Sequence, residues 1–203
     1  MSCTFPTHII EDTIAFHGHS CPGLAIGIRA SELAFRELGT PEETNMVAIA
    51  ETDMCGVDAI QFLTDCTLGK GNFMHRDFGK MAFSFFDRNT GKGFRALLNP
   101  ENRTDLDVEL GVLMGRESEG SATAAELKRI PEVKEILKER LMAMDLDDMF
   151  NVTWTQNGPP RPARVLASLT CEKCGEPTME SRTRRFAGKT LCSQCFEAME
   201  QKI

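Results

Sequence analysis

Two imidazoles and a thiol stand at alternate positions near the start of the chain, at His17, His19 and Cys21. Pro22 suits the first position of a following helix, so Cys21 is predicted at the helix N-cap, where the helix dipole favours a thiolate. Imidazole and thiolate are ligands that a borderline-soft ion such as zinc selects. A buried histidine or a free structural cysteine is the alternative for each residue alone. Three donors within five residues favour a metal site.

A second thiol, Cys55, stands between a predicted strand and a predicted helix, where helix N–H groups again favour the thiolate. Asp53 and Asp58 could orient a ligand or accept a proton. The ordinary alternatives are a first-turn helix carboxylate for Asp58 and a small buried residue for Cys55. The metal ligands expected in the core are His17, His19, Cys21 and Cys55, and the candidate catalytic groups are Cys21, Cys55, Asp53 and Asp58.

The two core thiols are both predicted at helix N-termini, so bringing them together is costly unless a cation or a proton lies between them. A metal ion would remove that cost, and the imidazoles would complete its coordination without adding charge. Without a metal, Cys21 and Cys55 could instead form a redox or nucleophilic pair.

Two CxxC pairs, Cys171/Cys174 and Cys192/Cys195, lie near the end of the sequence and are separated by 17 residues. Four thiolates can close a tetrahedron around one zinc ion and leave no open position, which indicates a structural site. Zinc binding would supply most of the folding free energy of so short a module. A predicted helix after the second pair is typical of a treble-clef-like finger.

Basic residues in this segment, Arg182, Arg184 and Arg185, raise the alternative of nucleic-acid binding. Only Phe186 interleaves them, and the chain as a whole carries a formal charge of -7. Nucleic acid is therefore not the expected partner.

The loop around Lys70 contains two glycines but departs from the phosphate-binding pattern GxxxxGK[ST]. Gly71 stands where serine or threonine is required, and Asp65 lacks the conformational freedom of a glycine. Lys70 could still contact an anionic ligand. His8 and His75 have no donors at ligand spacing, so we expect ordinary surface or packing roles for them.

The composition, with 41% hydrophobic and 26% charged residues, is that of a globular protein. No apolar run approaches the roughly 18 to 20 residues that span a bilayer. Glu11 and Asp12 interrupt any signal-like start, so a cytoplasmic location is expected. In that compartment eight cysteines indicate metal ligands or reactive thiols before disulfides.

The elements that must position these residues follow from hydrophobic periodicity and turn residues. We expect helices near 7–16, 24–38, 57–63, 107–117 and 122–144, with Pro131 interrupting the last, and strands at 46–51, 81–87, 93–98 and 150–156. The predicted fold is α+β, a mixed β-sheet with packed helices, followed by a small treble-clef-like zinc finger. The proline-rich segment 157–162 divides a core domain, 1–158, from a linker and finger, 159–203.

Four segments, 16–23, 51–61, 66–72 and 77–82, together with the terminal CxxC pairs, resemble the FmdE-like family, which is named after formylmethanofuran dehydrogenase. Asp65 departs from the glycine expected there. The resemblance implies an α+β core with an attached zinc finger, metal binding by the histidine–cysteine segment and assembly as a homodimer. It does not imply the activity in the family's name, which comes from operon association with a molybdenum or tungsten enzyme whose redox chemistry resides in other subunits.

Two classes of function follow. The first is a metal-binding accessory or catalytic protein, in which a core ion with an open position polarises a carbonyl or activates water. The second is a non-enzymatic module that uses its zinc finger to bind a partner protein or nucleic acid. A molybdenum or tungsten enzyme is one candidate partner. The residues do not decide whether the chain is an enzyme, and they name no substrate.

Overall fold

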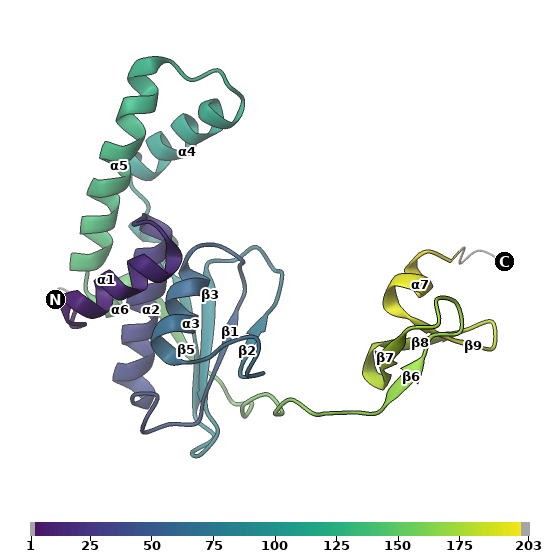
Figure 1. Ribbon diagram of the computed structural model, residues 1–203. Helices are drawn as coiled ribbons and strands as arrows, with labels where there is room; N and C mark the ends of the chain where they lie inside the picture. The colour runs from purple at the N-terminus through teal and green to yellow at the C-terminus, as the bar shows by residue number, and fades with distance from the viewer. Residues whose placement is uncertain (1–2, 200–203) are drawn as a thin grey trace. The chain divides into compact units, whose positions relative to one another are not determined.

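A computed structural model describes residues 3–199 of the chain, which divides between Pro162 and Ala163 into two compact units. The sequence placed this boundary after Gly158, inside the same proline-rich segment. Figure 1 shows the order of the elements within each unit. Within residues 3–199, no helix is both long enough and apolar enough to cross a membrane.

The first unit is built on a five-stranded mixed sheet with the strand order β2-β1-β3-β4-β5. β1 pairs in parallel with β2 and antiparallel with β3, and the remaining pairs are antiparallel. The strands are β1 (Met46–Ala50), β2 (Phe73–His75), β3 (Ala82–Asp87), β4 (Gly93–Leu98) and β5 (Phe150–Trp154). The predicted α+β fold with a mixed sheet is confirmed. β2 escaped prediction because three residues carry no periodicity.

Six α-helices of this unit are described: α1 (Thr7–His17), α2 (Pro22–Leu38), α3 (Gly56–Thr64), α4 (Asp105–Ser118), α5 (Ala124–Ala143) and α6 (Leu146–Met149). A 3-10 turn, η1 (Pro100–Asn102), precedes α4. α2 is the central helix, since every residue from Leu24 to Ala34 is buried. It packs on the sheet face that carries Ala48, Phe85 and Phe94.

The prediction that Pro131 interrupts the helix expected at 122–144 is wrong, because α5 continues through this residue. Pro131 is exposed, while Ile130, Val133 and Leu137 on the same helix are buried in a cluster with Leu113 of α4. Burial of this apolar stripe offsets the hydrogen bond that proline cannot donate. α4 and α5 thus form a helical hairpin (Figure 1).

The second unit consists of two small antiparallel hairpins and one short helix. Its elements are β6 (Ser168–Thr170), β7 (Pro177–Met179), a 3-10 turn η2 (Glu180–Arg182), β8 (Thr183–Phe186), β9 (Lys189–Cys192) and α7 (Ser193–Glu197). The first CxxC pair lies in the turn between β6 and β7, and the second joins β9 to α7. This is the predicted treble-clef-like arrangement. Leu191, fully buried, is the centre of its small apolar cluster.

Candidate metal centre

The turn between α1 and α2 positions three of the four predicted core ligands. α1 ends at His17, and Gly18 adopts a left-handed conformation with φ of 90°, which reverses the chain before His19. Cys21 is the N-cap of α2, as predicted, and its sulfur accepts a hydrogen bond from the Leu24 N–H at 3.3 Å. The sulfur is thereby held at the positive end of the helix.

The fourth predicted ligand, Cys55, reaches this turn because α2 and α3 touch backbone to backbone. A Cβ added at Gly27 would lie 2.2 Å from the Gly56 carbonyl oxygen, and one added at Gly23 would lie 3.2 Å from the Cβ of Cys55. Only glycine allows so close an approach. The crossing of the two helices therefore brings Cys55, at the start of α3, beside Cys21, at the start of α2.

The four donor groups converge on one point. One ligand atom each of His17, His19, Cys21 and Cys55 can be chosen so that all lie within 4.8 Å of one another. The edges of a tetrahedral zinc site measure about 3.3 to 3.8 Å for bonds of about 2.0 to 2.3 Å. The two imidazole rings are neighbours, with centroids 4.4 Å apart. Small side-chain movements would complete a two-nitrogen, two-sulfur site.

His17 provides the observation that most favours a metal ion. Its Nδ1 lies 2.7 Å from Oδ2 of Asp58, and its Nε2 is buried without a hydrogen-bond partner anywhere in residues 3–199. When Nδ1–H donates to the carboxylate, Nε2 carries a free lone pair. A buried polar atom without a partner is costly, and a metal ion satisfies it.

The thiols also indicate a need for positive charge. Burial raises the pKa of the Cys55 thiol, and the neighbouring Cys21 sulfur raises it further. Two adjacent thiolates repel each other unless a cation lies between them. Their combined charge would balance that of a divalent ion, so the residues present fit such a group.

Two other predicted site residues lie outside this convergence. Asp53 is exposed and contributes no ligand atom to the cluster. Lys70 forms an exposed ion pair with Asp65. Asp65 itself adopts φ of 57°, so the position where glycine was expected is left-handed and aspartate tolerates it. Functional roles for Asp53 and Lys70 remain predictions.

The second cluster is formed by the sulfurs of Cys171, Cys174, Cys192 and Cys195, which also lie within 4.8 Å of one another. Cys171 accepts a hydrogen bond from the Cys192 N–H at 3.3 Å. Backbone donors, that of Cys174 foremost, lower the pKa of Cys171 to about 6, whereas the neighbouring Cys192 sulfur raises the pKa of Cys195 to about 12. The four sulfurs thus share limited negative charge, which one zinc ion would neutralise.

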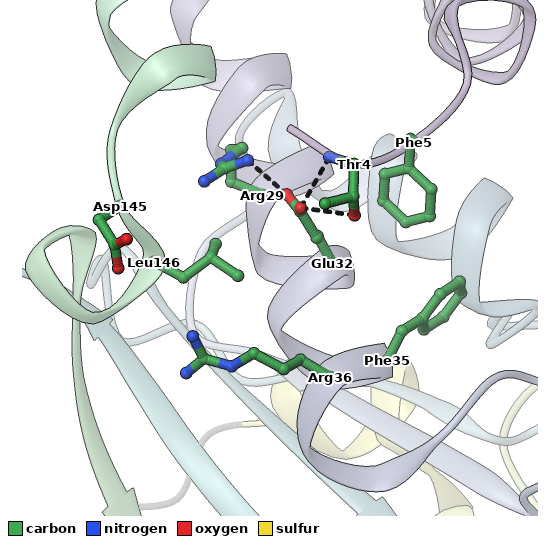
Figure 2. A pocket seen from close by; sticks show the side chains of 8 residues that line it. All are labelled: Thr4, Phe5, Arg29, Glu32, Phe35, Arg36, Asp145 and Leu146. Atoms are coloured by element: carbon green, nitrogen blue, oxygen red, sulfur yellow. Dashed lines mark hydrogen bonds and ion pairs between the residues drawn. The ribbon is translucent and has the colours of Figure 1, made fainter. Parts of the chain in front are cut away.

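A cavity of about 320 Å³ lies further along α2 and is shown in Figure 2. Its buried Glu32 carboxylate accepts hydrogen bonds from the backbone N–H and hydroxyl of Thr4 at 2.8 and 2.7 Å, and pairs with Arg29 at 2.5 Å. These charges hold the N-terminal segment against α2. Arg29 follows Cys21 by eight residues, about 12 Å of helix, so this cavity is separate from the metal centre.

An α+β core joined to a four-cysteine zinc finger defines a class of two-unit protein with two metal-ligand clusters. A family model described as "FmdE, Molybdenum formylmethanofuran dehydrogenase operon" matches residues 16–151, and one described as "Prokaryotic dksA/traR C4-type zinc finger" matches residues 166–201. The chain belongs to the FmdE family, which confirms the resemblance found in its sequence.

Two individual proteins resemble most of the chain. A protein from Syntrophus aciditrophicus described as "tungsten formylmethanofuran dehydrogenase subunit e (fmde)-like" is 26% identical, with a TM-score of 0.61 over 97% of this chain and 94% of that one. A "Probable S-adenosyl-L-methionine-binding protein" of Archaeoglobus fulgidus is 31% identical over 93% of this chain. The match covers 52% of that relative, so the chain spans about half its length.

Proposed function

We propose that the chain is a metal-binding accessory protein whose core holds one zinc or similar transition-metal ion between His17, His19, Cys21 and Cys55. The zinc finger would hold a second, structural zinc ion. The observation that carries the core site is the buried Nε2 of His17, which has no hydrogen-bond partner among residues 3–199 and whose other ring nitrogen is held by Asp58. A carboxylate behind a histidine is the usual support of a histidine that binds metal.

The donor set favours a four-coordinate zinc site over a site with a coordination position that is always free of protein ligands. Two imidazoles and two thiolates fill a tetrahedron, and the ion would be electrically neutral with its ligands. His19 is the exposed member of the set and the ligand most easily displaced. An ion exposed by its displacement would supply Lewis-acid chemistry. Asp58 would keep His17 in the correct tautomer throughout.

Association with other chains is part of the proposal. Apolar side chains on the α4–α5 hairpin are 43–51% exposed, namely Val108, Val112, Met114, Leu127 and Ile136. Exposed apolar patches mark interaction surfaces. A second copy of the chain is the first candidate partner, and a molybdenum or tungsten enzyme of the kind named by the family is the next. Sedimentation at micromolar concentration tests the dimer.

A second candidate function, binding of S-adenosyl-L-methionine, is favoured by the 31% identity to the Archaeoglobus fulgidus relative. Calorimetric titration of the metal-loaded full chain with this compound tests it. Saturable binding would support this candidate, and absence of heat at millimolar concentration would place the relative's named property in the part that this chain lacks.

The main experiment is metal analysis of full-length protein purified without a metal-affinity tag. We expect two ions per chain, with one lost in Cys55→Ser and the other lost in Cys174→Ser. Cobalt substitution adds a spectroscopic test, because the thiolate charge-transfer band of the two-sulfur core site should be about half as intense as that of the four-sulfur finger.

The control is Cys66→Ala, which removes a buried thiol outside both clusters. This variant should retain two ions. One ion per chain in the wild type, lost only in Cys174→Ser, would refute the core site and leave the zinc finger unaffected.

A further inference from the structure

A second, smaller cavity borders the candidate metal centre. It has a volume of about 100 Å³, is partly open to solvent and lies between α1, α2 and α5, and its wall includes Ile14, Cys21, Leu24, Ile28, Lys138 and Met142. Figure 1 shows these three helices meeting near the chain's N-terminus. The cavity belongs to none of the roles assigned above, although it touches Cys21, one of the four core donors.

The wall of this cavity is apolar on almost every side. Leu24 and Ile28 are fully buried, and Ile14 and Met142 pack against the same cluster. Water gains few hydrogen bonds in such a space, whereas a hydrocarbon chain loses nothing there. Its volume suits about four to six non-hydrogen atoms.

Two polar residues, Ser20 and Lys138, complete the lining, and Lys138 is the cation among them. The Lys138 side chain is 25% exposed, and its ammonium pairs with Glu135 of the same helix at 2.5 Å. Glu135 is 56% exposed, so water screens this pair and an incoming anion can compete for the ammonium. A single ammonium beside apolar walls suits an anion with one negative charge and an apolar remainder. A phosphate dianion would require several donors.

We propose that this cavity binds a short-chain organic acid, whose carboxylate pairs with Lys138 and whose alkyl chain lies against Cys21. The functional role of this binding rests on the proposed function, because the acid would be held beside the core ion. The cavity itself is formed by three packed helices and does not depend on the ion.

The test is calorimetric titration of the zinc-loaded full chain with butyrate, with acetate, decanoate and 1-butanol as comparison ligands. Butyrate should bind saturably and at least fivefold more tightly than acetate or decanoate, which are too short and too long. It should also bind more tightly than butanol, which lacks the charge. Butanol binding as tight as butyrate would overturn the role of Lys138.

Substitutions in the cavity wall and one control substitution locate the binding. Lys138→Gln should weaken butyrate binding about five- to tenfold, whereas Lys128→Gln, the same change on an exposed part of α5, should not alter it. Ala25→Leu should fill the cavity and abolish binding. If Ala25→Leu fails to fold, Met142→Trp is the alternative variant that fills the cavity. Unchanged binding in the filled cavity would refute the proposal.

The same samples separate this proposal from the core metal site. Cys55→Ser should lose the core ion yet retain butyrate binding, because Cys55 does not line the cavity. A wild-type chain without a core ion that still binds butyrate would refute the metal site alone. A chain with two ions that binds no butyrate would refute the cavity proposal alone.

Discussion

The two metal-ligand clusters differ in how the chain assembles them. The four sulfurs of the zinc finger come from two tight turns within 25 residues, Cys171 to Cys195, in a unit whose apolar cluster is small. The core donors come from the end of α1, the following turn, the start of α2 and the start of α3. The core scaffold has its own sheet and buried helix. We infer that zinc organises the finger, whereas the core fold organises its metal site.

Removal of one finger ligand should abolish the fold of the whole finger. Cys174→Ser should unfold residues 168–197 and leave the core intact, because structural zinc contributes on the order of 10 kcal/mol to such modules. Hydrogen exchange measures this, with protection lost in β6–β9 and retained in β1–β5. Cys21→Ser is the matched change in the core and should remove one ion without loss of sheet protection. A core that unfolds in Cys21→Ser would contradict the inference that the core folds without its ion.

A large effect on the core is expected where α2 and α3 touch. Gly27→Ala places a Cβ 2.2 Å from the Gly56 carbonyl oxygen, so the helices must separate. We expect the free energy of unfolding of the core to fall by about 2 to 4 kcal/mol. The core ion should be lost and the finger zinc retained. The observable is the unfolding midpoint reported by Trp154, the only tryptophan, which lies on β5.

Gly111→Ala is the control for this substitution. A Cβ at Gly111, in the middle of α4, would meet no heavy atom of residues 3–199 within 4 Å apart from its chain neighbours and the backbone of its own helix. Alanine there should be neutral or stabilising by about 0.5 to 1 kcal/mol. Equal destabilisation by the two changes would show that helix propensity, and not the α2–α3 contact, decides the result.

A smaller effect is expected from the carboxylate behind His17. Asp58→Asn should weaken core metal binding about 10- to 100-fold, because an amide orients the imidazole less strongly, while the fold and the finger zinc stay unchanged. Competition with a chromophoric chelator measures the affinity. Asp53→Asn, an exposed carboxylate outside the cluster, is the comparison. If that variant weakens binding more than Asp58→Asn, the assignment of the supporting carboxylate is wrong.

Local patterns predicted part of this architecture. The CxxC spacing indicates the finger cluster because all four sulfurs lie in two short turns, and Pro22 indicates that Cys21 is an N-cap. The contact of Gly27 with Gly56 is different, since it joins helices that are distant in sequence, and no local period reports such a crossing. Pro131 misled prediction because the tertiary burial of its helix outweighs a local penalty. The orphaned Nε2 of His17 became visible only with the packing around it.

A small effect on stability is expected from the ion pair between Glu51 and Arg95, which stabilises the core without metal. Arg95 donates two hydrogen bonds to the Glu51 carboxylate, at 2.6 and 2.8 Å, which lowers the pKa of that carboxyl. The stabilisation is therefore complete above the unfolded value of about 4.3 and is lost as the pH falls through the lower folded value. Glu51→Gln should lower the free energy of unfolding of the core by about 1 kcal/mol at pH 7. Below about pH 4, this free energy should depend less on pH than in the wild type.

Trp154 fluorescence during acid titration measures this, because Trp154 lies on β5 of the core and the finger contains no tryptophan. Glu119→Gln, at an exposed position after α4, serves as the control and should follow the wild type. The comparison of the two units predicts that acid releases finger zinc before Trp154 reports unfolding, since thiolates protonate above the pH at which Glu51 does. Simultaneous transitions would mean that the core, like the finger, depends on its ion.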